Sequence, residues 1–528
     1  IVAQSPKVAA IFDKWRTTDT AALLSNLQKN QELKTALLEE TPWVLEAKSE
    51  AQQKQNIARL FETHQLSKGL NSAIDKLSKM QNNDGSFGWF PGMGSNRYIT
   101  QYILTGMAKL QSMNVKAAQD KEVQNILRKG LSFLDTEVLK DYRNIKKEQL
   151  KQNNLSQSQV QYLYLRSFMN STVPQEAKIA YDYYMSQEKQ FWMDQNNYMQ
   201  GMIALTQFRK ADKPTANTIM ESLSERALRS KEMGMYWNNA RSYWWYDLPV
   251  ESHALLITAF EEIKKDEKTV DDLKVWLLKQ KQTQNWQTTT ATADAVYALL
   301  RSGTDWLQYE PEVVISLGNM TINSAQEKTE AGTGYFKKQI EGKDVKPEMG
   351  NIKVTVDNKT GKNTGTSWGA VYWQYFENMD KITSSAGASP LNITKQLYIE
   401  TNTDRGPVLK EITTNQPLKI GDKVKVRIVL KVDRDMEYVH MKDMRAAGFE
   451  PVNVLSGYKW NSGLGYYEST KDIATHFFFD RLPKGTFVFE YPLVVAQKGT
   501  FSNGITTAQC MYAPEFSSHT EGIRVEVK

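Results

Sequence analysis

The residue types that most often carry catalysis or bind metals are few in this sequence and lie far apart. The 528 residues include five histidines and one cysteine, Cys510. No two histidines form an HExxH pair or any other i,i+4 pair; they are His64, His253, His440, His476 and His519. A single cysteine excludes an internal disulfide bond and a cysteine-rich zinc site. We therefore expect no bound metal, no cofactor and no catalytic residue.

The other motifs of enzyme chemistry are missing as well. The sequence has no GxSxG, GxxxxGK[ST] or GxGxxG segment, so neither a nucleophile elbow nor a nucleotide-binding loop is predicted. The acidic pair Asp271 and Asp272 lies at a predicted helix start, where carboxylates are stabilised by the helix dipole. His253 lies on an otherwise apolar helical segment, and we interpret it as a packed or capping histidine, with a role in a site as the alternative.

Composition and charge indicate a folded, multidomain protein. Charged residues make up 24% and aromatic residues 11%, which is a globular composition. The net charge of +6 over this length gives no electrostatic case for a nucleic-acid partner. No apolar run approaches the roughly 20 residues of a membrane-spanning helix. At roughly 100–200 residues per domain, the length predicts three or four domains.

The hydrophobic period changes once along the chain. From Ser5 to about Gln308 apolar residues recur at helical spacing, as in Val160, Leu163 and Tyr164, and about twelve to fourteen helices are predicted. After Tyr309 the pattern alternates with period two, as in residues 424–430 and 487–491, which is typical of antiparallel strands. The predicted fold class is therefore multidomain, α then β, with β-sandwich domains in the second half.

Three segments of the helical half are variants of one unit, in which an aromatic-rich turn joins two helices. The turns are residues 81–89, 237–246 and 284–289. Repeated hairpins of this kind close into an α/α toroid of inner and outer helices. We interpret the tryptophans of these turns as packing residues; they are Trp89, Trp237, Trp244, Trp245 and Trp286. Domain boundaries are predicted near 308 and, at the small and polar run 384–390, near 395.

Several segments, taken in order, resemble the C-terminal part of the bacterial alpha-2-macroglobulin family. Residues 83–90 and the helix that follows are similar to the DGSF turn of that family, and residues 445–451 are similar to its PAGFE segment. The remaining similar segments are residues 287–296, 485–491, 498–501 and 511–515. The resemblance implies a thioester-domain-like toroid over 1–308, a CUB-like linking sandwich over 309–395, and a C-terminal macroglobulin-like sandwich over 396–528.

The resemblance also implies a function. In this family a protease cleaves a bait region, the inhibitor collapses around the protease, and a Cys–Gln thioester acylates a nucleophile. We therefore expect proteases as partners of the full-length parent, with no enzyme activity, no nucleic acid and no small-molecule cofactor. The expected location is extracytoplasmic, either periplasmic or anchored to the cell envelope, and in the anchored case the membrane anchor would lie upstream of this segment.

The resemblance places two functional segments on this sequence. The toroid loop at the thioester end corresponds to Asp84, Gly85, Phe87, Trp89 and Tyr98, and a lid over the thioester corresponds to Met511 and Tyr512. Tyr98 stands where some thioester proteins have a general-base histidine, so direct attack by amines is expected if a thioester exists.

The thioester itself is not in this sequence. No CxEQ motif occurs between Ile1 and Trp89, and Cys510 lies in the wrong half. Because the sequence opens at Ile1 without a signal peptide and enters helical periodicity almost at once, we expect a larger parent with the thioester just upstream; the alternative is that the parent lacks it.

Two other classes of function compete with the protease inhibitor. One is a structural or adhesive surface module without thioester chemistry. The other is a toroidal lyase or cyclase with β accessory domains, because the 81–89 turn resembles the QW repeat of triterpene cyclases. A cyclase also needs an acidic DxDD motif, which this sequence lacks.

Overall fold

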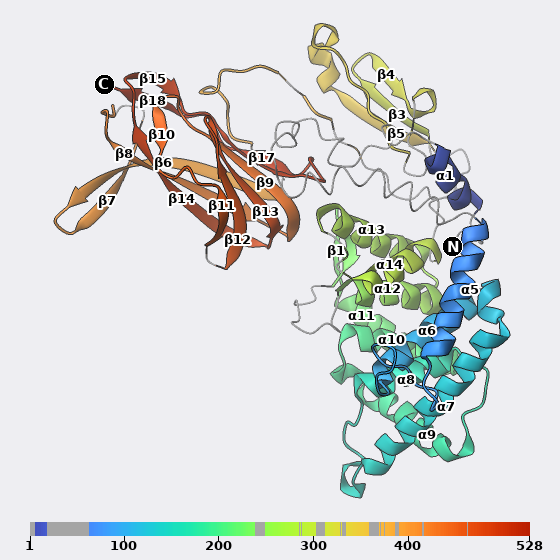
Figure 1. Ribbon diagram of the computed structural model, residues 1–528. Helices are drawn as coiled ribbons and strands as arrows, with labels where there is room; N and C mark the ends of the chain where they lie inside the picture. The colour runs from blue at the N-terminus through green and yellow to red at the C-terminus, as the bar shows by residue number, and fades with distance from the viewer. Residues whose placement is uncertain are drawn as a thin grey trace. The chain divides into compact units, whose positions relative to one another are not determined.

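The computed structural model has a helical first half and an antiparallel β second half, as the change of period predicts (Figure 1). It describes residues 6–17, 63–237, 249–284, 286, 288–301, 312–327, 329, 334–357, 369, 371–373, 375–385, 390–413, 417–461 and 463–528. Trp244 and Trp245, and the predicted boundary near 308, lie outside the described residues. None of the described helices is long and apolar enough to cross a membrane.

The helices alternate with short turns. They are α1 (Pro6–Thr17), α5 (Thr63–Met80), α6 (Arg97–Ser112), α7 (Lys121–Asn144), α8 (Gln157–Ser167), α9 (Gln175–Phe191), α10 (Asn197–Arg209), α11 (Lys213–Glu225), α12 (Pro249–Ala259), α13 (Glu267–Thr283) and α14 (Thr289–Arg301). Short 3-10 turns cover Lys116–Gln119, Lys147–Gln149 and Trp192–Asp194, and a π turn, Phe260–Lys264, extends α12. A small hairpin, β1 (Leu228–Ser230) and β2 (Gly234–Tyr236), follows α11.

Polar side chains cap the first turns of these helices, at positions where polar residues interrupt the apolar pattern. The Asn96 side chain accepts a hydrogen bond from the Ile99 N–H at the start of α6, and Asn196 does the same for Met199 at the start of α10. Ser156 and Gln159 form a capping box at the start of α8. Each cap satisfies backbone N–H groups that a helix leaves unpaired, so short polar loops suffice between the helices.

The even-numbered helices form an ordered series. Helix α6 contacts α8, α8 contacts α10, α10 contacts α12, and α12 contacts α14. An ion pair joins the last helix of this series to the first: Lys109 Nζ of α6 lies 2.9 Å from Asp294 Oδ1 of α14. Such a closed order of contacts is what the predicted toroid requires of its inner helices.

The helical half has two buried clusters of apolar side chains. One gathers residues of α6 to α9, including Leu104, Ile126 and Tyr184, and the other gathers residues of α8 to α14, including Ile203 and Leu256. Glycine lets two of these helices approach closely: a Cβ on Gly130 of α7 would lie 2.6 Å from the Leu104 side chain of α6.

The β half begins with a three-stranded antiparallel sheet. Its strands are β3 (Glu312–Leu317), β4 (Met320–Asn323) and β5 (Ile352–Asp357), in the order β4-β3-β5. Short 3-10 turns accompany them at Ser324–Gln326, Gly342–Asp344 and Pro347–Gly350.

Residues 391–528 form two sheets packed on one apolar core. The strands are β6 (Leu391–Thr403), β7 (Gly406–Glu411), β8 (Lys423–Val432), β9 (Met436–Met444), β10 (Phe449–Pro451), β11 (Gly457–Asn461), β12 (Leu464–Thr470), β13 (Ala474–Leu482), β14 (Gly485–Val495), β15 (Gly499–Ser502), β16 (Thr506–Cys510), β17 (Ser517–His519) and β18 (Arg524–Val527). The sheet orders are β10-β14-β8-β6-β7 and β11-β12-β13-β9-β16-β17, and β15 pairs with β18. Alternate residues of β8 and β14 point into the shared core, as period-two strands require. Strand β6 begins at Leu391 and runs through the predicted division at 395.

A buried carboxyl group lies between α9 and α10 and forms no ion pair with any residue that the structure describes. Glu188 is completely buried, its Oε2 accepts a 2.8 Å hydrogen bond from Gln207 Nε2, and its Oε1 has no partner among the described residues. Burial raises the pKa of Glu188 well above its usual value, and the Gln207 hydrogen bond does not offset this effect.

Replacing Glu188 with glutamine is therefore expected to remove a pH-dependent loss of stability. The folded-state pKa lies above the unfolded value, so the wild type loses stability as pH rises between them, by about 1.4 kcal/mol for each pH unit. Thermal unfolding at pH 5 and pH 8 measures this. The gain of Glu188→Gln over the wild type should grow with pH, whereas Glu176→Gln, at an exposed position of the same helix, should show no such trend. Parallel curves for the wild type and Glu188→Gln would contradict the prediction.

Candidate functional site at the start of helix α6

The turn between α5 and α6 is held by one carboxylate. Asp84 Oδ1 accepts hydrogen bonds from the Ser86 N–H at 2.9 Å and the Ser86 hydroxyl at 2.6 Å, and Asp84 Oδ2 accepts from the Ser95 hydroxyl at 2.6 Å. Partial burial acts to raise the pKa of Asp84, but these hydrogen bonds outweigh it and lower the pKa. Asp84 is therefore ionised at neutral pH and fixes both sides of the turn.

Gly85 and Phe87 anchor this turn to the helices beneath it. Gly85 has φ of +89°, and a Cβ there would lie 2.3 Å from the Lys129 carbonyl oxygen of α7. The Phe87 side chain is completely buried, and its N–H donates to the Thr100 hydroxyl at 2.9 Å. The sequence Asp-Gly-Ser-Phe thus encodes a polar clamp, a position for glycine and an apolar anchor in four residues.

Aromatic rings continue from the turn along α6. The Trp89 ring stacks on Tyr98 with a centroid distance of 6.3 Å, and Tyr98 stacks on Tyr102 at 6.2 Å. Trp89 is 50% exposed and Tyr102 is 41% exposed. The interpretation of Trp89 as a packing residue is thus wrong, whereas Trp237 is buried and its indole N–H donates to the Leu223 carbonyl oxygen at 2.9 Å. Trp286 is partly buried against the core of α8 to α14.

Tyr98 is a neutral phenol in this setting. Burial raises its pKa to about 12, and the nearby Tyr102, Glu251 and Asp294 act in the same direction. A phenol with this pKa keeps its proton at neutral pH, so Tyr98 can donate a hydrogen bond but cannot accept a proton as a histidine would.

The starts of α12 and α14 bring further polar groups to Tyr98. Glu251 is buried, and its Oε1 accepts hydrogen bonds from the Thr288 and Thr290 hydroxyls, each at 2.9 Å. The Thr288 hydroxyl also accepts the Ala291 N–H at 2.9 Å and so caps α14. The sequence did not single out Glu251, because a carboxylate in the first turn of a helix is common for electrostatic reasons alone.

Lys109 and Asp294 form a charged pair further along the same helices. Each side chain is about one-fifth exposed. Burial acts to lower the pKa of Lys109, but the Asp294 carboxylate outweighs it and raises that pKa. The ammonium also lies 5.4 Å from the centre of the Tyr297 ring. Lys109 is therefore charged at neutral pH, and its ammonium is not a general acid or base poised near pH 7.

His253 is a packed residue of α12. It is 3% exposed, its Nε2 lies 2.8 Å from the Leu273 carbonyl oxygen, and its ring lies 4.2 Å from that of Trp276. Burial lowers its pKa to about 4, so it is neutral at physiological pH. This agrees with the packing interpretation.

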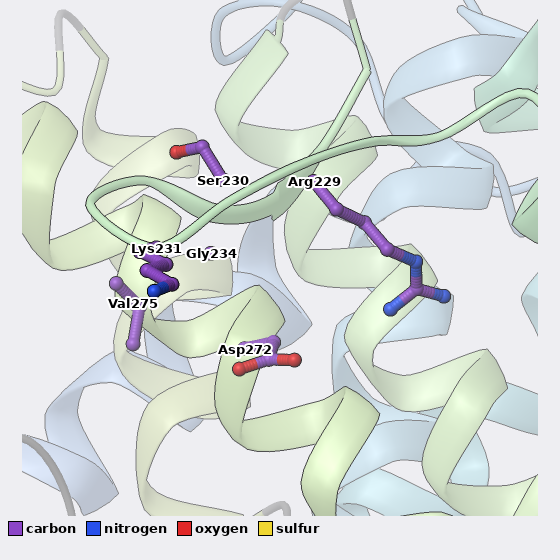
Figure 2. Close-up of a pocket in the computed structure, with 6 residues that line it drawn as sticks. All are labelled: Arg229, Ser230, Lys231, Gly234, Asp272 and Val275. Carbon is purple, nitrogen blue, oxygen red and sulfur yellow. The ribbon is translucent and has the colours of Figure 1, made fainter.

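A shallow pocket of 370 Å³ lies where the β1–β2 hairpin meets α13 (Figure 2). The hairpin contributes Arg229, Ser230, Lys231 and Gly234, and the helix contributes Asp272 and Val275. It is polar and open, and its lining includes none of the residues of the predicted site. Among the residues that the structure describes, no group of three or more histidine, cysteine, aspartate or glutamate side chains could hold a metal ion.

Residues 391–515 match the family model of the bacterial alpha-2-macroglobulin MG10 domain. The predicted resemblance to bacterial alpha-2-macroglobulins is confirmed. An alpha-2-macroglobulin homolog from Nostoc sp. strain PCC 7120 is 22% identical over 476 residues, which cover 87% of this chain and 23% of that protein. The chain thus spans less than a quarter of that relative's length.

Solved structures of bacterial alpha-2-macroglobulins also match almost the whole chain. The Escherichia coli protein activated by porcine elastase is 13% identical, with a TM-score of 0.38, over 96% of this chain and 41% of that one. The trypsin-activated Escherichia coli protein is 12% identical, with a TM-score of 0.39, over 96% of this chain and 31% of that one. The Salmonella protein reacted with methylamine is 12% identical, with a TM-score of 0.34, over 99% of this chain and 31% of that one.

Within the MG10 domain, Met511 and Tyr512 follow strand β16. Met511 is 1% exposed, and its N–H donates to the Tyr438 carbonyl oxygen at 2.8 Å. The Tyr512 ring meets that of Tyr438 edge-on at 5.2 Å. Both residues thus contact strand β9 of their own domain. Their role as a lid concerns a contact with the helical half and stays a prediction.

Cys510 of the MG10 domain is a packing residue. It is completely buried in the domain core, and burial raises the pKa of its thiol to about 12. Because the thiolate is the reactive form, this thiol is unreactive at neutral pH and does not replace a thioester cysteine.

Proposed function

We propose that this chain is the C-terminal part of an alpha-2-macroglobulin-like inhibitor that traps proteases of broad specificity and is not itself an enzyme. The observation that carries the proposal is the MG10 domain over residues 391–515, which follows a helical half that contains the DGSF turn. The match to the Nostoc homolog over 87% of the chain supports the same order of parts.

The site described above supports binding rather than turnover. Its polar groups are engaged in structural contacts: Asp84 clamps the turn, Glu251 holds two threonines, and Lys109 pairs with Asp294. Trp89 and Tyr102 present half-exposed rings, which suit the cover of a reactive group or a docked segment. In this proposal the loop at residues 84–89 and Tyr98 face the thioester end, and any thioester lies upstream of Ile1.

A trapped protease keeps its active site but is shielded from large substrates, and this separates a trap from other inhibitors. The full-length parent should be incubated with trypsin or elastase, and cleavage of a protein substrate compared with cleavage of a short chromogenic peptide. We expect cleavage of the protein substrate to fall while peptide cleavage continues. Equal loss of both activities, or no loss of either, would reject the trap.

Fractionation of the source cells tests the proposed location in the periplasm or on the envelope.

A structural or adhesive module is the second candidate function. It is favoured by the absence of a CxEQ motif from the sequence and by the unreactive Cys510. Treatment of the parent with labelled methylamine shows whether it has an intact thioester, since only an intact thioester takes up the amine. A parent that takes up no amine and does not alter proteolysis of the protein substrate is a module of this second kind.

The lid predicted at Tyr512 can be tested in the same parent if it takes up methylamine. Removing a flat aromatic ring that covers a thioester should let water and amines reach it. We expect Tyr512→Ala to accelerate methylamine uptake at least several-fold. Tyr458→Ala, at a position 64% exposed in the same domain, is the control and should leave the rate unchanged. An unchanged rate in Tyr512→Ala would refute the lid.

A further inference from the structure

The core of the MG10 domain contains a lysine and an aspartate that are completely shielded from solvent. Lys395 stands in the inward row of β6 between Ile393 and Leu397, where the pattern calls for an apolar residue. Asp443 stands on β9, in the opposite sheet. Both side chains are 0% exposed. Burying two charges in an apolar core is costly, so this pair needs a reason beyond packing.

The two side chains are in direct contact. Lys395 Nζ lies 2.6 Å from Asp443 Oδ1 and donates to the Met444 carbonyl oxygen, also at 2.6 Å. Two hydroxyls donate to the carboxyl group: Thr506 to Oδ1 at 2.6 Å, and Tyr491 to Oδ2. The amine therefore faces a carboxyl whose oxygens are already held by O–H donors.

The buried setting disfavours a charged amine at Lys395. Burial lowers the pKa of Lys395 although Asp443 opposes this effect. In a dry site, transfer of one proton from Nζ to Oδ1 along their contact gives an amine and a carboxylic acid, which are cheaper to bury than two ions. A neutral amine next to a protonated carboxyl is the pair of reactants from which an amide forms.

We propose that Lys395 and Asp443 condense to an isopeptide bond that joins the two sheets of the MG10 domain. The Nζ lone pair attacks Cγ of protonated Asp443, a C–N bond forms, one C–O bond breaks, and the hydroxyl leaves with a proton from Nζ as one water. Neither an oxidant nor a cofactor is needed. The Tyr491 and Thr506 hydroxyls stabilise negative charge on the carboxyl oxygens during attack, and the fixed geometry makes the step intramolecular.

The mass of the intact 528-residue chain tests the bond without any variant. Under denaturing conditions we expect the wild type to weigh one water less than its sequence. After proteolysis, a branched peptide should contain both Lys395 and Asp443. The full sequence mass, with the two residues recovered in separate peptides, would overturn the proposal, as would a water loss that maps to any other position.

Substitutions at Asp443 report on the chemistry of the bond. Asp443→Ala should restore the full sequence mass. Asp443→Asn keeps an electrophilic carbon but changes the leaving group, so that variant should lose one ammonia in place of one water. A loss of one water that persists in Asp443→Ala would show that the linkage lies elsewhere and would also overturn the proposal.

Discussion

Replacing Gly85 with alanine is expected to destabilise the helical half by about 3 kcal/mol. An L-residue in the left-handed region costs roughly 1–2 kcal/mol, and overpacking adds roughly 1–3 kcal/mol. Here the added Cβ would lie 2.3 Å from the Lys129 carbonyl oxygen, and a backbone atom inside a helix cannot rotate away. The turn must therefore lift from α7 or distort. Urea unfolding followed by circular dichroism measures the loss.

Gly92 provides a matched control for Gly85. It lies in the same turn region with φ of +82°, but a Cβ there would meet nothing within 4 Å. Gly92→Ala should therefore show only the backbone cost of roughly 1–2 kcal/mol. Equal losses in the two variants would mean that contact with α7 does not determine the requirement for glycine at position 85.

Lys109→Met is expected to lower the free energy of unfolding by about 3 kcal/mol. Removing one member of a largely buried pair leaves Asp294 without its counter-charge, a change that costs roughly 3–5 kcal/mol in buried pairs, and partial exposure places this one at the lower end. Combining Lys109→Met with Asp294→Leu should recover part of the loss, because no charge is then left uncompensated. Losses that simply add in the double variant would contradict a direct interaction.

The pair Lys178 and Asp182 on α9 is the control for Lys109. Its side chains lie 2.8 Å apart, but they are 53% and 54% exposed. Exposed pairs at this spacing contribute only about 0.3–0.5 kcal/mol, so Lys178→Met should have little effect in the same assay.

The sequence predicted the class of each half because each follows one period over a long stretch. Helical spacing in residues such as Val160 and Leu163 and alternation in Val424 and Val426 are repeated too often to be ambiguous, and the structure confirms both. The DGSF turn was also predictable, because glycine and aspartate carry local backbone information.

The polar interior of the helical half could not be predicted in the same way. Lys109 and Asp294 are 185 residues apart, and each sits on a helix with many exposed charges, so nothing local marks either one as a partner of the other. The role of Glu251 could not be predicted for a similar reason, since its threonine partners lie at the start of a different helix. Trp89 was misread because composition cannot tell a tryptophan that packs inside from one that stacks half-exposed on Tyr98.

The distance along the chain between Lys109 and Asp294 also sets an order of events during synthesis. Helix α6 leaves the ribosome long before α14 exists, and loop closure over 185 residues carries an entropic cost that local helix contacts do not. The neighbouring even-numbered helices can pack together as they are synthesised. The surface of α6 that contacts α14 stays uncovered until α14 has been made. A nascent chain stopped before residue 294 should therefore be more susceptible to chaperone capture and aggregation than the finished helical half.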